Sequence, residues 1–369
     1  MEERSIKERL SGRHGMCMLA LFVLGSTLVT EDIHPTRQSA WIALLLGAVA
    51  AIPLVLMYWR IQRIFRGASL YEIVFSVFGK VAGAVLSALY ALFFAHVAAL
   101  IVARFVVFAH MTTLAHTPGI WLALIVCALA GWMGALGARR LGRASVMLFL
   151  LVAVELAALL LLSFSKAEPG RLLPIFEAEP WAFADEAFTY FSVPFAQSVV
   201  FLCVFHGIPD RSEQSRAWRF GAVMGVLVVA VNLVRVAMVL GGQIMGSLYY
   251  STFLSSSVIG MDSLLQRVEV ILSHAFFLSL FVKVAVYLHA AGQGCARLFA
   301  GWDAPKAAIA LSVAVAVAAA CLGSSVSLIT DLYLAYRVYS IPFQALLPLI
   351  IWIRGELIVR KQKKGAPVA

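Results

Sequence analysis

The sequence predicts an all-α integral membrane protein with about ten transmembrane helices. Its 369 residues are 62% hydrophobic and only 13% charged, whereas soluble domains carry about 25% charged residues. A helix needs about 20 apolar residues to cross the roughly 30 Å hydrocarbon core of a bilayer. Such stretches lie near residues 14–30, 39–59, 81–110, 118–138, 144–165, 187–208, 220–242, 266–290, 307–328 and 338–359. Little of the chain remains for a soluble domain.

Lysine and arginine are distributed unequally between the connections. If both termini are cytoplasmic, the inner segments and connections hold about twenty of the 29 basic residues, and the outer connections hold four. These four are Arg37, Lys166, Arg171 and Arg337. The positive-inside rule therefore predicts a cytoplasmic N-terminal segment, residues 1–13, and a basic cytoplasmic tail, residues 360–369. The basic residues are dispersed between spans, which argues against nucleic-acid binding.

The longest outer connection, residues 166–186, divides the spans into two groups of five, residues 14–165 and 187–359. Because five is an odd number, the second group runs in the opposite orientation to the first, which predicts an inverted repeat. The connection is rich in acidic residues and proline. It is either a solvated crossover between the halves or a docking surface for a partner.

Two spans contain residues that disfavour a helix at corresponding places in the two halves. Gly25, Ser26 and Thr27 predict a short unwound segment at 24–27, and Pro194 predicts a break at 191–195 because proline lacks an amide donor. Freed backbone groups are tolerated at membrane depth where protein or water satisfies them, so we expect one shared cavity. The alternative is a simple kink with a packed glycine.

A zwitterionic amino acid fits such a cavity. Half-helix ends present amide groups to a carboxylate and carbonyl groups to an ammonium. The predicted ligand-binding residues are Gly25, Ser26 and Thr27 of the first span, Tyr190, Ser192, Pro194 and Gln197 of the sixth, and Arg104 of the third.

Four further ionisable residues lie within predicted spans: Glu155, Arg235, Glu269 and Lys283. Counting about 1.5 Å per residue places Arg104 level with Glu155, and Arg235 and Glu269 near the outer ends of neighbouring spans. Both pairs are therefore expected to be in contact. They serve either as structural ion pairs or in ion coupling and gating.

Catalytic and metal-binding patterns are missing from the sequence. The histidines and five cysteines show no metal-ligand spacing, so neither a metal nor another cofactor is expected. The sequence contains no Walker A motif, nucleophile elbow or catalytic Cys/His pattern. An enzyme is the least supported class.

Several short motifs resemble the B subunit of GerA-type spore germinant receptors, the spore germination permeases of the amino acid, polyamine and organocation transporter superfamily. They are Gln38–Trp41 (QSAW), Phe78–Lys80 with Gly83, Leu114–Pro118 (LAHTP), Leu172–Ile175 (LLPI), Leu265–Glu269 (LQRVE) and Lys283. The resemblance covers about residues 14–358. Ser39 and Gln197 depart from the pattern, since the family often has Asp and Glu there.

The resemblance implies a leucine-transporter-like fold of two inverted five-helix repeats, with broken helices 1 and 6 holding the ligand. It also implies an A-type membrane subunit and a lipoprotein C-type subunit as partners in the spore inner membrane, where nutrients trigger germination. The leading hypothesis is a nutrient sensor. The alternatives are an ion-coupled amino-acid permease and, more weakly, a ligand-gated ion or water conduit. Sensor and permease need the same differential binding between states, so sequence does not separate them.

Overall fold

A computed structural model describes residues 10–29, 34–260 and 267–363, and these residues form helices and connections without any strand. The predicted basic segments at the two ends and part of the LQRVE motif therefore lie largely outside the described residues. The helices are α2 (Gly12–Thr27), α3 (Ala40–Ile64), α4 (Leu70–Thr112), α5 (Gly119–Ala135), α6 (Ala138–Ser163), α7 (Pro180–Tyr190), α8 (Arg211–Leu240), α9 (Gly242–Met245), α10 (Ser251–Gly260), α11 (Glu269–Leu298), α12 (Ala304–Leu322), α13 (Val326–Tyr339) and α14 (Leu347–Lys363). Short 3₁₀ or π segments are η1 (Arg37–Ser39), η2 (Pro169–Leu172), η3 (Phe191–Phe195), η4 (Ala196–Cys203), η5 (Phe205–Gly207) and η6 (Pro342–Leu346).

The prediction of an all-α membrane protein is confirmed. Within the described residues, seven helical segments are long and apolar enough to cross a bilayer. Each of the ten predicted spans overlaps a helix, but α2 and α5 have only 16 and 17 residues. The sixth span is divided among α7, η3 and η4. The structure thus supports the fold class without confirming ten complete spans.

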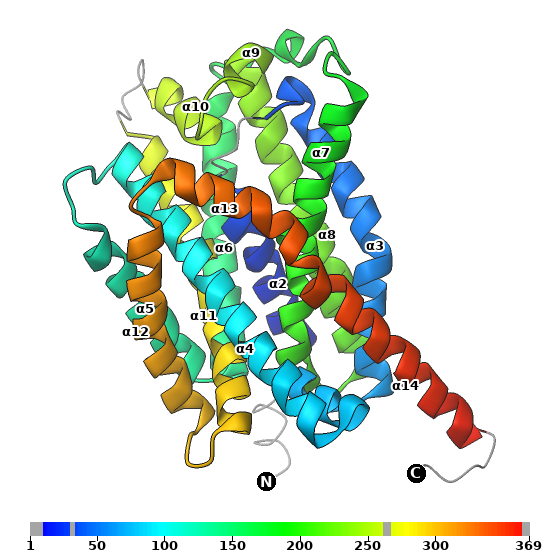
Figure 1. Ribbon diagram of the computed structural model, residues 1–369. Coiled ribbons are helices and arrows are strands. Elements are labelled where there is room, and N and C mark those ends of the chain that lie inside the picture. Colours follow the sequence, from blue (N-terminus) through cyan, green and yellow to red (C-terminus); the bar gives the residue numbers. More distant parts are fainter. Residues whose placement is uncertain (1–9, 30–33, 261–266, 364–369) are drawn as a thin grey trace.

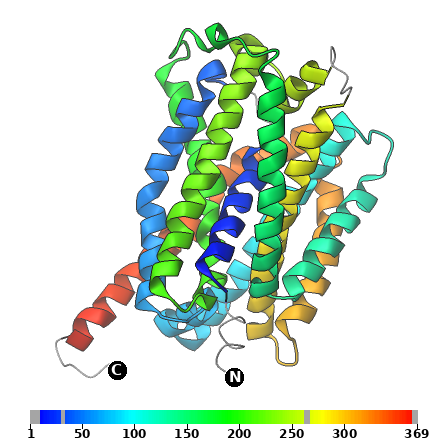
Figure 2. The same cartoon turned by 180° about the vertical axis from the view of Figure 1, so that it is seen from behind.

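Helix α2 lies in the centre of the bundle, beside α6, α8 and α11 (Figure 1). Its residues Met18–Leu24 are at most 1% exposed. Helices α5 and α12 pack together on one side of the bundle, and α3 packs on α7 and α8 on the other (Figure 2). The neighbouring helices therefore shield polar side chains of α2 from lipid.

The longest helix, α4, contains a bend with a clear local cause. It begins with a capping box, in which the Ser69 hydroxyl accepts from the amide of Glu72 and the Glu72 carboxylate accepts from the amide of Ser69. Gly79 then adopts φ 80° and ψ −173°, a conformation open mainly to glycine. The long membrane-crossing part of α4 therefore starts only after Gly79.

The predicted unwinding at residues 24–27 is wrong. Helix α2 continues to Thr27, and the Thr27 hydroxyl donates to the Val23 carbonyl at 2.7 Å within the helix. A Cβ atom built on Gly25 would lie 2.7 Å from the carbonyl oxygen of Ser279 on α11. The glycine thus allows two helices to approach closely, because any larger side chain there would collide with the backbone of α11.

The break in the sixth span is confirmed. Val193 has φ −134° and ψ 115°, backbone angles that lie outside the helical region, and it is followed by a cis bond to Pro194.

The predicted connection 166–186 is shorter than expected, because α7 already begins at Pro180. Proline is favoured in the first helical turn, where its missing amide donor has no consequence.

Candidate ligand-binding chamber and vestibule

A small chamber, lined mainly by apolar side chains with a few polar ones, lies where the end of α2 meets the break in the sixth span. Residues of α2, α4, α11 and α13 and of the break line it; among them are Gly25, Ser26, Arg104, Val193, Gln197 and Tyr333. Its volume is about 30 Å³, which accommodates roughly one water molecule. A larger ligand can enter this chamber only if lining side chains move.

Gln197 places an unsatisfied acceptor in the chamber. Its side chain is 3% exposed, and its Nε2 donates to the Tyr336 hydroxyl at 3.0 Å. Its Oε1 is buried and has no hydrogen-bond partner among the described residues. Gln344 also donates to Tyr336, at 2.6 Å, but its own Oε1 accepts from Ser340 at 3.1 Å. Of these two amides, only Gln197 keeps an acceptor available for a ligand.

Two cations lie beside the chamber. The Arg104 guanidinium stacks on the ring of Tyr333, with its central carbon 3.8 Å from the ring centroid. Lys283 of α11 is fully buried, and its Nζ donates to the Ser26 hydroxyl at 2.7 Å and lies 4.3 Å from the centroid of Phe22. Lys283 thus couples α11 directly to the last turn of α2.

A vestibule of about 350 Å³ adjoins the chamber. Ser26, Val193 and Tyr333 line both cavities, so Tyr333 stands at the boundary between them. The vestibule is also lined by Thr27, Tyr190 and charged residues of α7 and α13. Its volume lies within the range of small-molecule sites, which begins near 300 Å³.

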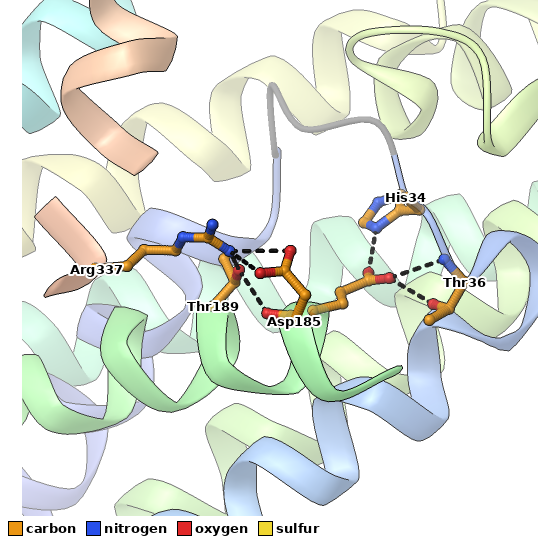
Figure 3. Close-up of polar contacts among 6 residues, drawn as sticks. His34, Thr36, Asp185, Thr189 and Arg337 are labelled. Carbon is orange, nitrogen blue, oxygen red and sulfur yellow. Dashed lines mark hydrogen bonds and ion pairs between the residues drawn. The ribbon is translucent and has the colours of Figure 1, made fainter. Parts of the chain in front are cut away.

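Asp185 and Glu186, two consecutive carboxylates of α7, bind residues on opposite sides of that helix (Figure 3). Glu186 is 5% exposed; it accepts from Thr36 through the hydroxyl at 2.5 Å and the amide at 3.2 Å, and contacts His34 Nδ1 at 2.7 Å.

Asp185 and Thr189 bind Arg337 of α13 on the other side of α7. The Nη1 group of Arg337, on α13, donates to both Asp185 oxygens at 3.1 and 3.2 Å and to the Thr189 hydroxyl at 2.6 Å. Helix α7 is therefore tied to residues 34–36 on one side and to α13 on the other.

The structure brings most predicted ligand-binding residues together. Gly25, Ser26, Arg104 and Gln197 line the chamber, and Thr27 and Tyr190 line the vestibule. Ser192 and Pro194 are buried in the break itself. The Ser192 hydroxyl donates to the Arg337 carbonyl at 3.2 Å, so Ser192 fixes the break against α13.

The two expected charge pairs do not form. Glu155 contacts His274 Nδ1 at 2.5 Å, while Arg104 stacks on Tyr333. Glu269 forms an ion pair with Arg267 at 3.5 Å. Arg235 instead donates to uncharged oxygen atoms of three residues, Asn232, Ser163 and Ser255. Depth counting fixes the height of a residue in the membrane but not the direction in which its side chain points.

Sequence reasoning missed the role of the carboxylates of α7. Asp185 and Glu186 belong to an acidic, proline-containing stretch, which favours a solvated connection. Pro180 was an available sign of a helix start, but the partners of Glu186 lie about 150 positions earlier in the chain. No local pattern connects them.

A bundle of long apolar helices with a small chamber at a broken span is typical of the architecture of secondary transporters. Two solved structures share the fold: that of MhsT in complex with L-phenylalanine, with a TM-score of 0.64, 15% identity and coverage of 95% of this chain and 97% of that one, and that of a Na⁺-coupled sialic acid symporter, with a TM-score of 0.57, 15% identity and coverage of 96% and 79%. They confirm the leucine-transporter-like fold.

The chain belongs to the spore germination protein family, whose permease model matches residues 9–325. It is 25% identical to spore germination protein KB of Bacillus subtilis (strain 168) over 366 residues, which cover 97% of this chain and 98% of that protein. The predicted membership of the spore germination permeases is thereby confirmed. The protein is an integral membrane protein of the receptor and permease class.

Proposed function

We propose that the protein is a nutrient sensor that binds a small zwitterionic ligand, such as an amino acid, in the chamber. The observation that carries this proposal is that the buried Oε1 of Gln197, which has no partner among the described residues, belongs to a side chain that lines the same chamber as Arg104. An α-ammonium donates to the former and an α-carboxylate accepts from the latter. The C-terminal ends of α2 and α7, which carry partial negative charge, favour the ammonium at the same place.

Binding in the chamber requires a change of conformation. A site of about 30 Å³ cannot hold an amino acid, whereas the adjoining vestibule of about 350 Å³ can. A ligand that passes Tyr333 and binds the enlarged chamber more tightly than the small one shifts the protein toward the enlarged state. In a sensor, this shift is the signal.

The signal needs a receiver, because almost all described residues lie in helices or short connections. We assign that role to an A-type membrane subunit and a lipoprotein C-type subunit in the spore inner membrane. Both termini are cytoplasmic in this scheme, and the two repeats, 14–165 and 187–359, meet through the outer connection 166–186. That connection continues into α7, so it is placed to transmit movement of the vestibule.

An ion-coupled amino-acid permease is the second candidate. It is favoured by the fold of the neighbours, one bound to L-phenylalanine and one a Na⁺-coupled symporter. The family description names a role in spore germination, which both candidates accommodate.

The test combines binding and transport. Purified protein in nanodiscs is heated with each amino acid in turn, and an amino acid at 100 times its dissociation constant should stabilise the protein by about 2.7 kcal/mol. Stabilisation by no amino acid would refute the proposed site. Saturable, ion-driven uptake by this chain alone in liposomes would instead establish the permease.

A further inference from the structure

Arg235 is a buried cation whose described partners are all neutral. It is 2% exposed and lies five residues before the end of α8. Its guanidinium donates to Asn232 Oδ1 at 3.2 Å, Ser163 Oγ at 3.4 Å and Ser255 Oγ at 3.0 Å. A guanidinium has five N–H groups, so further donors remain. A buried charge with no opposite charge beside it is costly in a membrane.

An apolar groove between α6 and α8 leads to this cation. It has a volume of about 220 Å³ and is lined by Ala157, Leu227 and Val231, with Asn232 and Arg235 contributing the polar groups. Leu227 and Val231 are 61% and 42% exposed, as expected of side chains that face lipid. From Leu227 to Arg235 the groove follows α8 for about 12 Å.

A second unsatisfied group lies among the residues that line this groove. Asn232 is 5% exposed, and its Nδ2 is buried without a hydrogen-bond partner in the described part of the chain. Its Oδ1 already accepts from Arg235. The groove therefore offers a buried amide donor and a guanidinium beside an apolar channel that faces the bilayer.

We propose that this groove binds an anionic phospholipid, with an acyl chain along α6 and α8 and the phosphate accepting hydrogen bonds from Arg235 and Asn232. The phosphate supplies a negative charge, which none of the described partners of Arg235 carries, and charge-assisted bonds of guanidinium to phosphate are among the strong ones. Arg235 lies about 7.5 Å from the end of α8, which is close to the boundary between acyl chains and headgroups. A membrane lipid fits this groove better than a soluble anion, because the apolar channel is continuous with the charge. The site is separate from the proposed ligand chamber.

The test is retention of lipid by the full-length purified protein. The protein is delipidated in mild detergent, titrated with phosphatidylglycerol, phosphatidylcholine or inorganic phosphate, and followed by native mass spectrometry and thermal stability. Phosphatidylglycerol should bind and stabilise at concentrations where the other two do not. Arg235→Gln should weaken this binding by at least about tenfold, which corresponds to about 1.4 kcal/mol. The matched control is Arg216→Gln, which removes the same charge from an exposed position of α8 and should bind phosphatidylglycerol as the wild type does.

A second variant keeps the charge and blocks the groove. Ala157 is exposed and lines the channel, so Ala157→Phe should also lose phosphatidylglycerol, whether or not Arg235→Gln can be purified. Equal stabilisation by inorganic phosphate would show an anion site and overturn the lipid proposal. Unchanged phosphatidylglycerol binding in Ala157→Phe would overturn it as well.

Discussion

Replacing Gln197 with leucine tests the ligand chamber most directly, because the side chain has one paired and one unpaired polar atom. In the empty protein the change removes a hydrogen bond to Tyr336, worth about 0.5–1.5 kcal/mol, but also removes a buried unsatisfied acceptor that costs about 1–3 kcal/mol. The stability of the ligand-free protein should therefore lie between about 0.5 kcal/mol below and about 2.5 kcal/mol above that of the wild type. A hydrogen bond from a ligand ammonium to Oε1 contributes about 1.5–3 kcal/mol, so affinity should fall by about 10- to 150-fold.

Gln344→Leu is the matched control. Gln344 donates to the same Tyr336 hydroxyl but has both side-chain groups paired. Its loss should lower stability by about 1–3 kcal/mol and leave affinity nearly unchanged. Thermal unfolding and calorimetric titration with the amino acid that best stabilises the wild type measure both quantities. Unchanged affinity in Gln197→Leu, or an equal loss of affinity in Gln344→Leu, would refute the assignment of Oε1 as a ligand contact.

Three further outcomes are expected. Gly25→Ala should destabilise the protein by about 1–3 kcal/mol, because the added Cβ meets the backbone of α11. Gly170 has open space around it, so Gly170→Ala should not destabilise the protein. Equal thermal stability of the two variants would contradict this expectation. Glu186→Ala should lower the free energy of unfolding by about 3–5 kcal/mol, because Glu186 is a buried, paired carboxylate. The side chain of Asp185 is 43% exposed, so Asp185→Ala should lower it by less than about 1 kcal/mol. The reverse order would argue against the buried network. On a Cys-free background, a cysteine at position 170 should react with an impermeant reagent from outside and one at Ser215 should not, as the charge asymmetry requires.

The sequence predicted the features that depend on composition and on the covalent nature of single residues. Apolar length predicted spans that each overlap a helix, because the bilayer sets how many residues a span needs. The break at Pro194 was predictable because proline has no amide hydrogen in any environment. The family and the fold class were predictable for the same reason, since both depend on patterns along the chain.

Features that depend on the neighbours of a residue were not predictable. The sequence does not show whether Gly25 unwinds a helix or allows α11 to approach closely. In the structure it allows the close approach of α11. Counting residues along the spans did not identify the partners of Glu155 and Arg235, because these depend on the rotation of each helix and on which helices are adjacent. Glu186 was assigned to a solvated stretch because its partners, His34 and Thr36, lie far away in the chain.

The attachment of α7 to neighbours on both sides, through Asp185 and Glu186, has a mechanical consequence. Asp185 and Glu186 are successive residues, so their side chains leave the helix about 100° apart and pull toward different neighbours. A rotation or slide of α7 therefore strains both attachments together. In the proposed sensor, movement of α7 would break or keep both attachments as a unit. The proposed response of each molecule to its ligand would then be a single step, and a graded response would arise only from the number of molecules that have switched.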